Sequence, residues 1–346
     1  MKPKILITGA SGFIGSFIVE EALRRGFETW AAVRKSSSRA FLRDDRIHFI
    51  ELDFSSEGTL TEQLHDHRFD YVVHAAGVTK CLHAEDFRRI NTEGTKNLVN
   101  ALRSLKMPVQ RFVYISSLSI MGAIREQQPY RDIMDSDTPQ PNTAYGRSKL
   151  EAEQWLHSLN RQGEARGDTA AAGDAFPYVI LRPTGVYGPR ERDYYMMFKS
   201  IKAHTDFAVG FRQQDITFVY VTDVVQAVFL ALQQGRTGRC YFLSDGEVYQ
   251  SSTFSDLIRK ELGNPWWIRI TAPLWLLRVI TCCSELVARC TGRVTALNND
   301  KYNIMRQRNW RCDITPARQE LGYAPQVQLA EGVRRCVAWY QEHGWL

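Results

Sequence analysis

The stretch Thr8-Gly9-Ala10-Ser11-Gly12-Phe13-Ile14-Gly15 follows the apolar run 4–7 and leads into a helical pattern over 17–25. The order of strand, glycine turn and helix is typical of a fold that binds a dinucleotide. Free N–H groups and the helix dipole at the start of such a helix favour a pyrophosphate. The expected cofactor contacts in this stretch are Gly9, Ser11, Gly12, Phe13, Ile14 and Gly15.

The three glycines have separate predicted tasks. Gly9 makes the tight turn, Gly12 lets the backbone approach the pyrophosphate, and Gly15 lets helix and strand pack closely. Glycine turns of this spacing also occur without any phosphate. The interpretation therefore depends on the rest of the chain.

Strand and helix patterns alternate along the first half of the chain. Because parallel strands need helical crossovers, the alternation predicts an α/β fold, a Rossmann-type doubly wound parallel sheet covered on both faces. Ligands of such sheets bind beyond the carboxyl ends of the strands. The expected strands lie at 4–7, 28–33, 47–52, 71–73 and 111–116, and the expected helices include one that opens at Asn91 and one that carries Tyr145.

The residues that follow the next three strands suit a dinucleotide cofactor, and the first two of them suit its adenosine part. Arg34 ends the second strand, where an arginine favours a 2′-phosphate, so NADP is preferred over NAD, with NAD as the alternative. A solvated loop arginine is the other interpretation. Asp53, followed by Phe54, can accept a hydrogen bond from the adenine amino group. The turn Ala75-Ala76-Gly77 is small enough to lie against a cofactor.

Ser117, Tyr145 and Lys149 carry the predicted chemistry. The i, i+4 spacing puts Tyr145 and Lys149 on one helix face. Because a tyrosine normally titrates near ~10, a nearby ammonium is expected to stabilise its phenolate and make it an acid/base group. Ser117 is expected to orient the substrate oxygen while a hydride moves to or from the nicotinamide.

At these residues the sequence resembles the extended short-chain dehydrogenase/reductase superfamily, which includes nucleotide-sugar epimerases and dehydratases. The resemblance covers nearly the whole chain and includes Asn91, the segment 181–189 and the segment 218–223. It implies that Asn91, Tyr145, Lys149, Pro183 and Val186 also bind the cofactor. It further implies a smaller substrate domain, with the cofactor domain over 1–185 and 214–246 and the substrate domain over 186–213 and 247–346.

Departures from the sugar-nucleotide branch indicate the substrate. That branch usually has an asparagine where this chain has Gly185, and an arginine where it has Ile216; the 4,6-dehydratases add an Asp-Glu pair where Leu118 to Met121 stand. The motifs look more like those of 3β-hydroxysteroid dehydrogenases and dihydroflavonol reductases. We therefore expect a secondary alcohol or ketone on a bulky, mostly apolar small molecule. The alternatives are a nucleotide-sugar epimerase/dehydratase with retained NAD(P) and a non-catalytic NADP-binding sensor.

Composition excludes several other classes of protein. The formal net charge of +6 over 346 residues is scattered, with no basic stripe typical of nucleic-acid binding. Seven cysteines without a C-x-x-C pair, and a first strand that leaves no room for a signal peptide, favour the cytoplasm, with thiols as apolar fillers. The spacing of His65, His67 and His74 fits no metal site, so we expect no metal.

Three further expectations concern the surface. The apolar stretch around Trp275 is too interrupted to span a membrane, because Arg278, Glu285 and Arg289 form one polar stripe along it. Its other sides must pack on its own domain, line a substrate pocket or touch a membrane surface. Residues 163–175 are expected to form a surface insertion. The resemblance implies a homodimer through the helices that begin near Asn91 and Tyr145.

Overall fold

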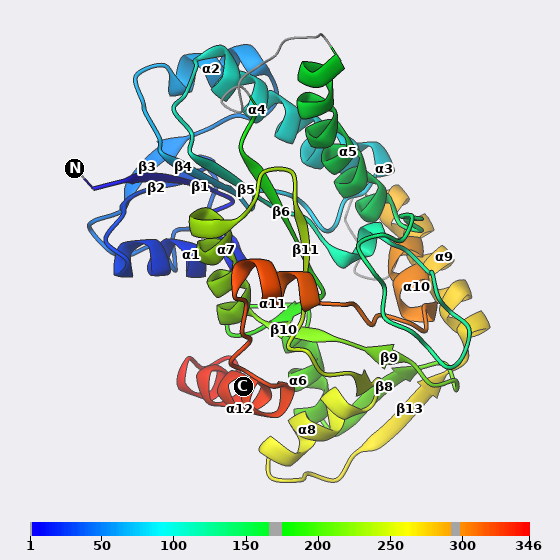
Figure 1. The fold of residues 1–346 in the computed structure, drawn as a ribbon. Coiled ribbons are helices and arrows are strands. Elements are labelled where there is room, and N and C mark those ends of the chain that lie inside the picture. Colours follow the sequence, from blue (N-terminus) through cyan, green and yellow to red (C-terminus); the bar gives the residue numbers. More distant parts are fainter. Residues whose placement is uncertain (1, 166–174, 292–297) are drawn as a thin grey trace.

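The computed structural model describes residues 2–165, 175–291 and 298–346. Its centre is a seven-stranded parallel sheet in the order β11-β6-β5-β4-β1-β2-β3 (Figure 1). This architecture confirms the predicted Rossmann-type α/β fold. The strands are β1 (Lys4–Thr8), β2 (Glu28–Val33), β3 (His48–Glu51), β4 (Tyr71–His74), β5 (Arg111–Ile115), β6 (Tyr178–Pro183) and β11 (Cys240–Leu243).

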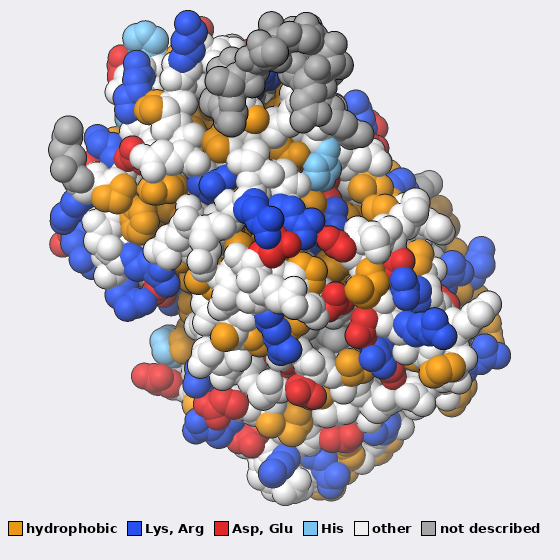
Figure 2. All heavy atoms as spheres, viewed as in Figure 1, with side chains coloured by type: hydrophobic (Ala, Val, Ile, Leu, Met, Phe, Trp, Pro, Cys, Tyr) orange, Lys and Arg blue, Asp and Glu red, His pale blue; other side chains and the backbone are white. Residues whose placement is uncertain are grey.

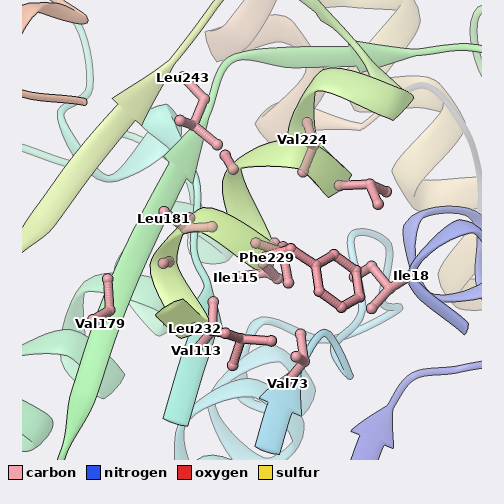
Figure 3. Close-up of a cluster of buried hydrophobic side chains, with 14 of the residues drawn as sticks. Ile18, Val73, Val113, Ile115, Val179, Leu181, Val224, Phe229, Leu232 and Leu243 are labelled. Carbon is pink, nitrogen blue, oxygen red and sulfur yellow. The ribbon is translucent and has the colours of Figure 1, made fainter. Parts of the chain in front are cut away.

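Helices cover both faces of this sheet. On one face α1 (Phe13–Arg24), α7 (Val221–Gln234) and α11 (Thr315–Leu321) pack on the sheet; on the other are α2 (Glu57–Leu64), α4 (Gly94–Ser104) and α5 (Ala144–Ala165). Neighbouring strand residues point to opposite faces, so Ile5 belongs to the first cluster and Leu6 to the second. Figure 3 shows Phe229 of α7 among Val73, Val113 and Ile18 of the first cluster.

The helix expected to open at Asn91 begins earlier. It starts with α3 (Ala84–Phe87), continues through a π-helical stretch (Arg88–Glu93) and runs into α4 without a break. Asn91 therefore lies inside the helix, in the π-helical part, and does not cap it. Such wide turns are frequent at functional sites.

The remaining elements form a second, smaller group, of which most lie below the sheet in Figure 1 and α9 and α10 lie at its right edge. Three two-stranded sheets pair β7 (Gly185–Tyr187) with β10 (Phe218–Tyr220), β8 (Thr205–Val209) with β13 (Ile268–Ala272), and β9 (Asp215–Ile216) with β12 (Tyr249–Gln250). The helices here are α6 (Tyr195–Lys202), α8 (Thr253–Glu261), α9 (Leu274–Thr291), α10 (Asn299–Arg306) and α12 (Leu329–Glu342).

A third apolar cluster joins α6, β7, β10, α8 and α12, and includes Tyr187, Phe198, Phe218, Phe254 and Tyr340. The division of the chain into 1–185 with 214–246 and 186–213 with 247–346 stays a prediction. Of the expected insertion at 163–175, residues 166–174 lie outside the described residues.

Two observations concern the surface. No helix in the described ranges is long and apolar enough to cross a membrane. Among the described thiols, Cys312 and Cys336 are buried as the expected apolar fillers, whereas Cys282 and Cys283 of α9 are exposed. The exposure of these two reflects the position of α9 at the edge of the molecule (Figure 1).

Candidate functional site

The glycine turn lies between β1 and α1, where the ends of β1 and β4 meet. Gly9 has a φ of +68°, and a Cβ there would lie 2.6 Å from the carbonyl oxygen of Ala75. A Cβ on Gly15 would lie 2.1 Å from the carbonyl oxygen of Gly9. Both positions therefore require glycine, the first for its turn and the second for close packing.

The N-terminus of α1 fits a phosphate group. Gly12 occupies the N-cap position and offers no side-chain hydrogen bond to the first turn, although its own N–H donates to the Gly9 carbonyl at 2.9 Å. Ser56 caps α2 and Asn298 caps α10, whereas α6, α7, α8 and α12 also begin without a side-chain cap. An uncapped helix start beside a glycine turn suits the pyrophosphate of a dinucleotide.

The turn after β4 contacts the end of β1, beside the glycine turn. The N–H of Ala76 donates to the hydroxyl of Thr8 at 3.2 Å. A Cβ on Gly77 would lie 3.0 Å from Asn91 Oδ1 and 3.4 Å from Lys149 Nζ. The turn thus brings the glycine loop, the π-helical stretch and α5 together.

The side-chain amide of Asn91 is hydrogen-bonded within the protein. Its Oδ1 accepts from the N–H of Val78 at 2.8 Å, and its Nδ2 donates to the Val78 carbonyl at 3.1 Å and to Ser148 Oγ at 3.0 Å. The side chain is buried. Asn91 therefore fastens the turn after β4 to α5, and its contact with a cofactor stays a prediction.

The adenosine residues follow β2 and β3 at the same edge of the sheet. Arg34 is exposed, and within the described residues its guanidinium has no hydrogen bond or ion pair. Asp53 is exposed, with Oδ1 accepting from the N–H of Ser55 at 2.9 Å. Phe54 is half-buried and lies with its ring centroid 5.9 Å from that of His74. The carboxyl ends of parallel strands meet at one edge, which explains the common location of the three residues.

His74 has a structural part in this edge. Nδ1 of its ring lies 2.7 Å from Thr8 Oγ1 and Nε2 lies 3.0 Å from Thr95 Oγ1, so the ring joins β1 and β4 to α4. Burial, and next the charge of Lys149, lowers the pKa of His74 to about 3. The ring is therefore neutral at physiological pH, and both of its nitrogens contact threonine hydroxyls of the protein.

Ser117 and Tyr145 meet beyond the end of β5. Ser117 follows that strand by two residues, and its Oγ accepts from the N–H of Ser119 at 3.1 Å. Tyr145 lies in the first turn of α5. Burial raises the pKa of Tyr145 to about 12, although a hydrogen bond with Ser117 opposes the rise. The two hydroxyl groups are thus side by side.

Lys149 lies one turn further along α5 and is buried. Its Nζ donates to the carbonyl of Ile115 at 2.8 Å and lies 4.6 Å from the ring centroid of Tyr114. Burial lowers the pKa of Lys149 to about 8, and the charge of Glu153 opposes this. The ammonium therefore faces the end of β5. The expected lowering of the pKa of Tyr145 by this charge is not found, because burial raises that pKa and only the hydrogen bond with Ser117 opposes the rise.

A carboxylate distant in sequence holds the start of α5. Asp300 of α10 accepts from the N–H of Ala144 at 2.8 Å and from that of Tyr145 at 3.3 Å. Thr143 Oγ1 accepts from the N–H of Gly146 at 2.9 Å. The first turn of α5, which carries Tyr145, is thereby fully capped. Sequence patterns missed Asp300, because nothing local marks a partner so far along the chain.

Behind Lys149 lies a buried ion pair that the sequence patterns also missed. Arg182 Nη2 is 2.6 Å from Glu153 Oε2. Glu153, His157 and Cys240 could together hold a metal ion by their spacing. Because the carboxylate already pairs with Arg182, a cation there would be repelled, and no metal site is assigned.

A cavity of about 610 Å³ extends from Ser117 into the smaller group of elements. Pro183 lies near Ser117 in its wall, whereas Val186 packs into the apolar clusters and does not line it. Most of the remaining wall is apolar and aromatic, with contributions from Tyr194, Met196, Met197, Phe207, Val209, Ile216, Phe218, Phe254, Ile304, Met305 and Trp310.

Gly185 and Ile216, the two departures from the sugar-nucleotide pattern, both line this cavity. A Cβ on Gly185 would lie 2.4 Å from the hydroxyl oxygen of Tyr194, so that hydroxyl fills the space of a side chain. Arg269 is the one cation of the described wall. Its Nε donates to Asp206 at 2.6 Å and its Nη2 to Asp256 at 2.7 Å. The cavity therefore offers no free positive charge.

Comparison with known proteins gives a family match over residues 5–244, to the model described as the NAD dependent epimerase/dehydratase family. A sterol-4-alpha-carboxylate 3-dehydrogenase (decarboxylating) of Candida albicans is 24% identical over 98% of this chain and 97% of its own. A dTDP-D-glucose 4,6-dehydratase of Homo sapiens is 25% identical, over 99% and 91%. A putative dihydroflavonol 4-reductase of Synechocystis is 26% identical, over 98% and 95%.

Solved structures share the fold. A UDP-glucose 4-epimerase of Thermotoga maritima, solved with UDP-glucose, has a TM-score of 0.77 at 22% identity and covers 98% of this chain and 99% of its own. A dTDP-glucose 4,6-dehydratase of Streptomyces venezuelae, solved with NAD, has a TM-score of 0.77 at 22% identity, over 99% and 98%.

Proposed function

The chain belongs to the NAD dependent epimerase/dehydratase family, the extended short-chain dehydrogenases/reductases, and on this premise we propose that it interconverts a secondary alcohol and a ketone on a bulky, mostly apolar substrate. The reaction is a hydride transfer with NADP, or with NAD as the alternative. Ser117, Tyr145 and Lys149 are the proposed catalytic residues.

The nicotinamide of the bound cofactor supplies or accepts the hydride. Ser117 donates a hydrogen bond to the substrate oxygen and fixes its position beside Tyr145. Since the pKa of Tyr145 is raised to about 12, the phenol is protonated at neutral pH and can give its proton to the oxygen of a ketone being reduced. Lys149 is proposed to hold the nicotinamide ribose, with its positive charge near the phenol.

The lack of a free cation in the described cavity wall is the observation that favours an apolar substrate. A nucleoside diphosphate sugar carries two phosphate charges, which need positive partners in a binding site. Arg269 is already paired with two aspartates, and the other wall residues are mostly apolar. A bulky, mostly apolar alcohol or ketone matches this wall, and two relatives carry the names of a sterol dehydrogenase and a dihydroflavonol reductase.

A nucleotide-sugar epimerase or dehydratase is the second candidate, because other relatives and structural neighbours carry such names. An epimerase returns the hydride to the substrate and keeps its cofactor. A sensor that only binds NADP is a third candidate. The contact between the hydroxyl groups of Ser117 and Tyr145 disfavours it, because a protein that only binds the cofactor has no need of this pair.

NADP is the proposed cofactor. Arg34 is exposed at the end of β2, with its guanidinium free of partners among the described residues. A free guanidinium there can pair with a 2′-phosphate. A homodimer through the helices near Asn91 and Tyr145, and a cytoplasmic location, stay predictions.

The proposal is tested by following nicotinamide absorbance with a panel of hydroxysteroid-like, flavonoid-like and simpler alcohols and ketones, with NADP and NAD, beside a UDP-sugar epimerisation assay. Turnover of an apolar ketone with NADPH is the expected result. Epimerisation without net cofactor consumption would instead assign the second candidate.

The variant Tyr145→Phe checks the catalytic assignment. It removes the proton donor, so turnover should fall by about 10²-fold or more while the cofactor still binds. Tyr302→Phe on α10, which the proposal gives no part in the reaction, is the control. Normal turnover by Tyr145→Phe would remove this residue from the mechanism.

A further inference from the structure

Large exposed apolar side chains gather on one side of the molecule. The described residues contain thirteen of them, and all except Val248 lie on α6, on β8 and the turn after it, on β13 with the residues before it, or on α9. We call these twelve the apolar face: Met196, Phe207, Phe211, Trp266, Ile268, Ile270, Trp275, Leu276, Val279, Ile280, Leu286 and Val287.

The elements of the apolar face are contiguous. α6 packs against β8, β8 pairs with β13, and β13 leads through Pro273 into α9. Gly210, just after β8, lies where a Cβ would be 3.7 Å from Leu274. α9 itself is held by buried Leu277 and Thr281 and leaves most of its apolar surface outside. Adjacent elements that all expose large apolar side chains are typical of an interaction surface.

The apolar face reaches the cavity at two of its residues. Met196 and Phe207 both line the cavity, and they are 58% and 67% exposed. A molecule that leaves the cavity on this side therefore moves directly onto apolar surface.

Cations border the apolar face. Arg212, Arg278 and Arg306 are exposed, and none has an ion pair with a described carboxylate. The guanidinium groups of Arg278 and Arg306 lie 6.0 and 5.8 Å from the ring centroid of Tyr302. Figure 2 shows Lys and Arg side chains beside hydrophobic ones along the edge where Figure 1 places α9 and α10.

Carboxylates near this border are already engaged. Asp256 pairs with Arg269, Glu285 accepts from the N–H of Asn299 at 2.9 Å, and Asp300 caps α5. Of these three carboxylates only Asp256 pairs with a cation, so Arg212, Arg278 and Arg306 have no carboxylate partner among the described residues. On α12, by contrast, Arg334 and its neighbour pair with Glu331.

We propose that the apolar face docks on the surface of a lipid bilayer that contains anionic lipids, with the mouth of the cavity against the acyl region. Apolar side chains and tryptophans insert at the boundary of headgroups and acyl chains, and basic residues bind anionic headgroups. A second copy of the chain fits less well, because a two-fold contact would bring the same unpaired arginines of both copies together.

This inference rests on the proposed function in one respect: the apolar substrate explains why an apolar cavity would open beside a bilayer. A substrate that partitions into lipid would pass from the bilayer into the cavity without crossing water. The binding measurement below needs no turnover, so failure of the proposed reaction and failure of the docking surface are separate results.

The test is flotation of the full chain with vesicles made of equal parts phosphatidylglycerol and phosphatidylcholine. The wild type should float with them, more weakly with phosphatidylcholine alone and more weakly at high salt. Replacing Trp275 and Val279 together by serine removes two exposed apolar side chains and should lower the partition coefficient by about tenfold or more. Arg212→Gln combined with Arg306→Gln should weaken binding to the anionic vesicles only.

Val248→Ser is the matched control, since Val248 is exposed but lies outside the apolar face; its vesicle binding should equal that of the wild type. Thermal unfolding of each variant checks that it is folded. Equal flotation of the Trp275/Val279 variant and the wild type would overturn the proposal. A second result would also overturn the proposal: the wild type does not bind vesicles and sediments as a dimer, whereas the Trp275/Val279 variant sediments as a monomer. The apolar face would then be an interface between copies.

Discussion

Lys149 shows how a single residue serves the site at a cost to stability. It is only 4% exposed, and its ammonium is held by one carbonyl and one aromatic ring. The pair of Glu153 with Arg182 lies behind it, so several charges are buried in one place. Burial of charge is expensive, and sites of this kind persist where the chemistry needs them.

Lys149→Met should change how stability depends on pH. The pKa of Lys149 is lowered from 10.5 to about 8 in the folded chain, so the unfolded chain holds the extra proton between these two values. In that window the wild type therefore gains free energy of unfolding as pH rises, and the variant lacks this gain. Urea denaturation at several pH values measures the difference.

The exposed lysine variant Lys202→Met serves as the control and should follow the wild type at every pH. Parallel curves for Lys149→Met and the wild type would show that the buried ammonium titrates alike in both states.

At the scale of the element, α5 depends on a helix from the far end of the sequence. Asp300 of α10 holds the N–H groups of Ala144 and Tyr145, while Ile304 and Met305 of the same helix line the cavity. The helix that carries the proposed acid/base group is thus joined to a wall of the substrate site. A shift of α10 would therefore change the position of the first turn of α5.

Asp300→Ala should therefore lower both stability and turnover. Loss of the cap costs about 1 kcal/mol, and a less ordered first turn should reduce kcat for the ketone found in the panel by about tenfold, with cofactor affinity unchanged. Asp300→Asn keeps an acceptor oxygen and should recover most of the loss. Steady-state kinetics and urea denaturation give the two readouts.

Ser56→Ala removes a comparable cap from α2, away from the site, because Ser56 Oγ accepts from the N–H of Thr59 at 3.1 Å. It should lose stability and keep its kcat. If Asp300→Ala keeps the wild-type kcat, the contact of Asp300 with the start of α5 has only a structural role.

At the scale of the whole molecule, the predicted cofactor residues lie at the carboxyl ends of β1, β2, β3 and β4, on α1, in the π-helical stretch and on α5. Any ligand that binds there stabilises the folded chain by mass action, by about 2.7 kcal/mol at a hundred times its Kd. Thermal unfolding therefore reports on cofactor choice without a substrate.

NADP should raise the unfolding midpoint more than NAD at equal concentration, and Arg34→Ser should remove most of that advantage while leaving the effect of NAD unchanged. The reason is the free guanidinium of Arg34, which is proposed to pair with the 2′-phosphate. Arg43→Ser, an exposed arginine further along the same loop region, is the control. An equal shift by both cofactors in the wild type would reverse the NADP assignment.

Local patterns predicted what depends on local sequence. The glycine turn, the strands of the sheet and the spacing of Tyr145 and Lys149 each follow from a few adjacent residues. Asp300 could not be predicted, because its place at α5 depends on tertiary packing. The same holds for the Tyr194 hydroxyl beside Gly185. The start of the helix at Asn91 was wrong, since a π-helical stretch continues an earlier turn.

The two exposed thiols of α9 have a practical consequence. Burial raises the pKa of Cys240 and of Cys312 to about 12, which makes both slow nucleophiles. Cys282 and Cys283 stand in solvent on the helix that carries much of the apolar face. A maleimide dye sensitive to polarity should attach there first, so the natural chain carries its own reporter for the environment of α9. Its emission would shift to the blue as that helix leaves water.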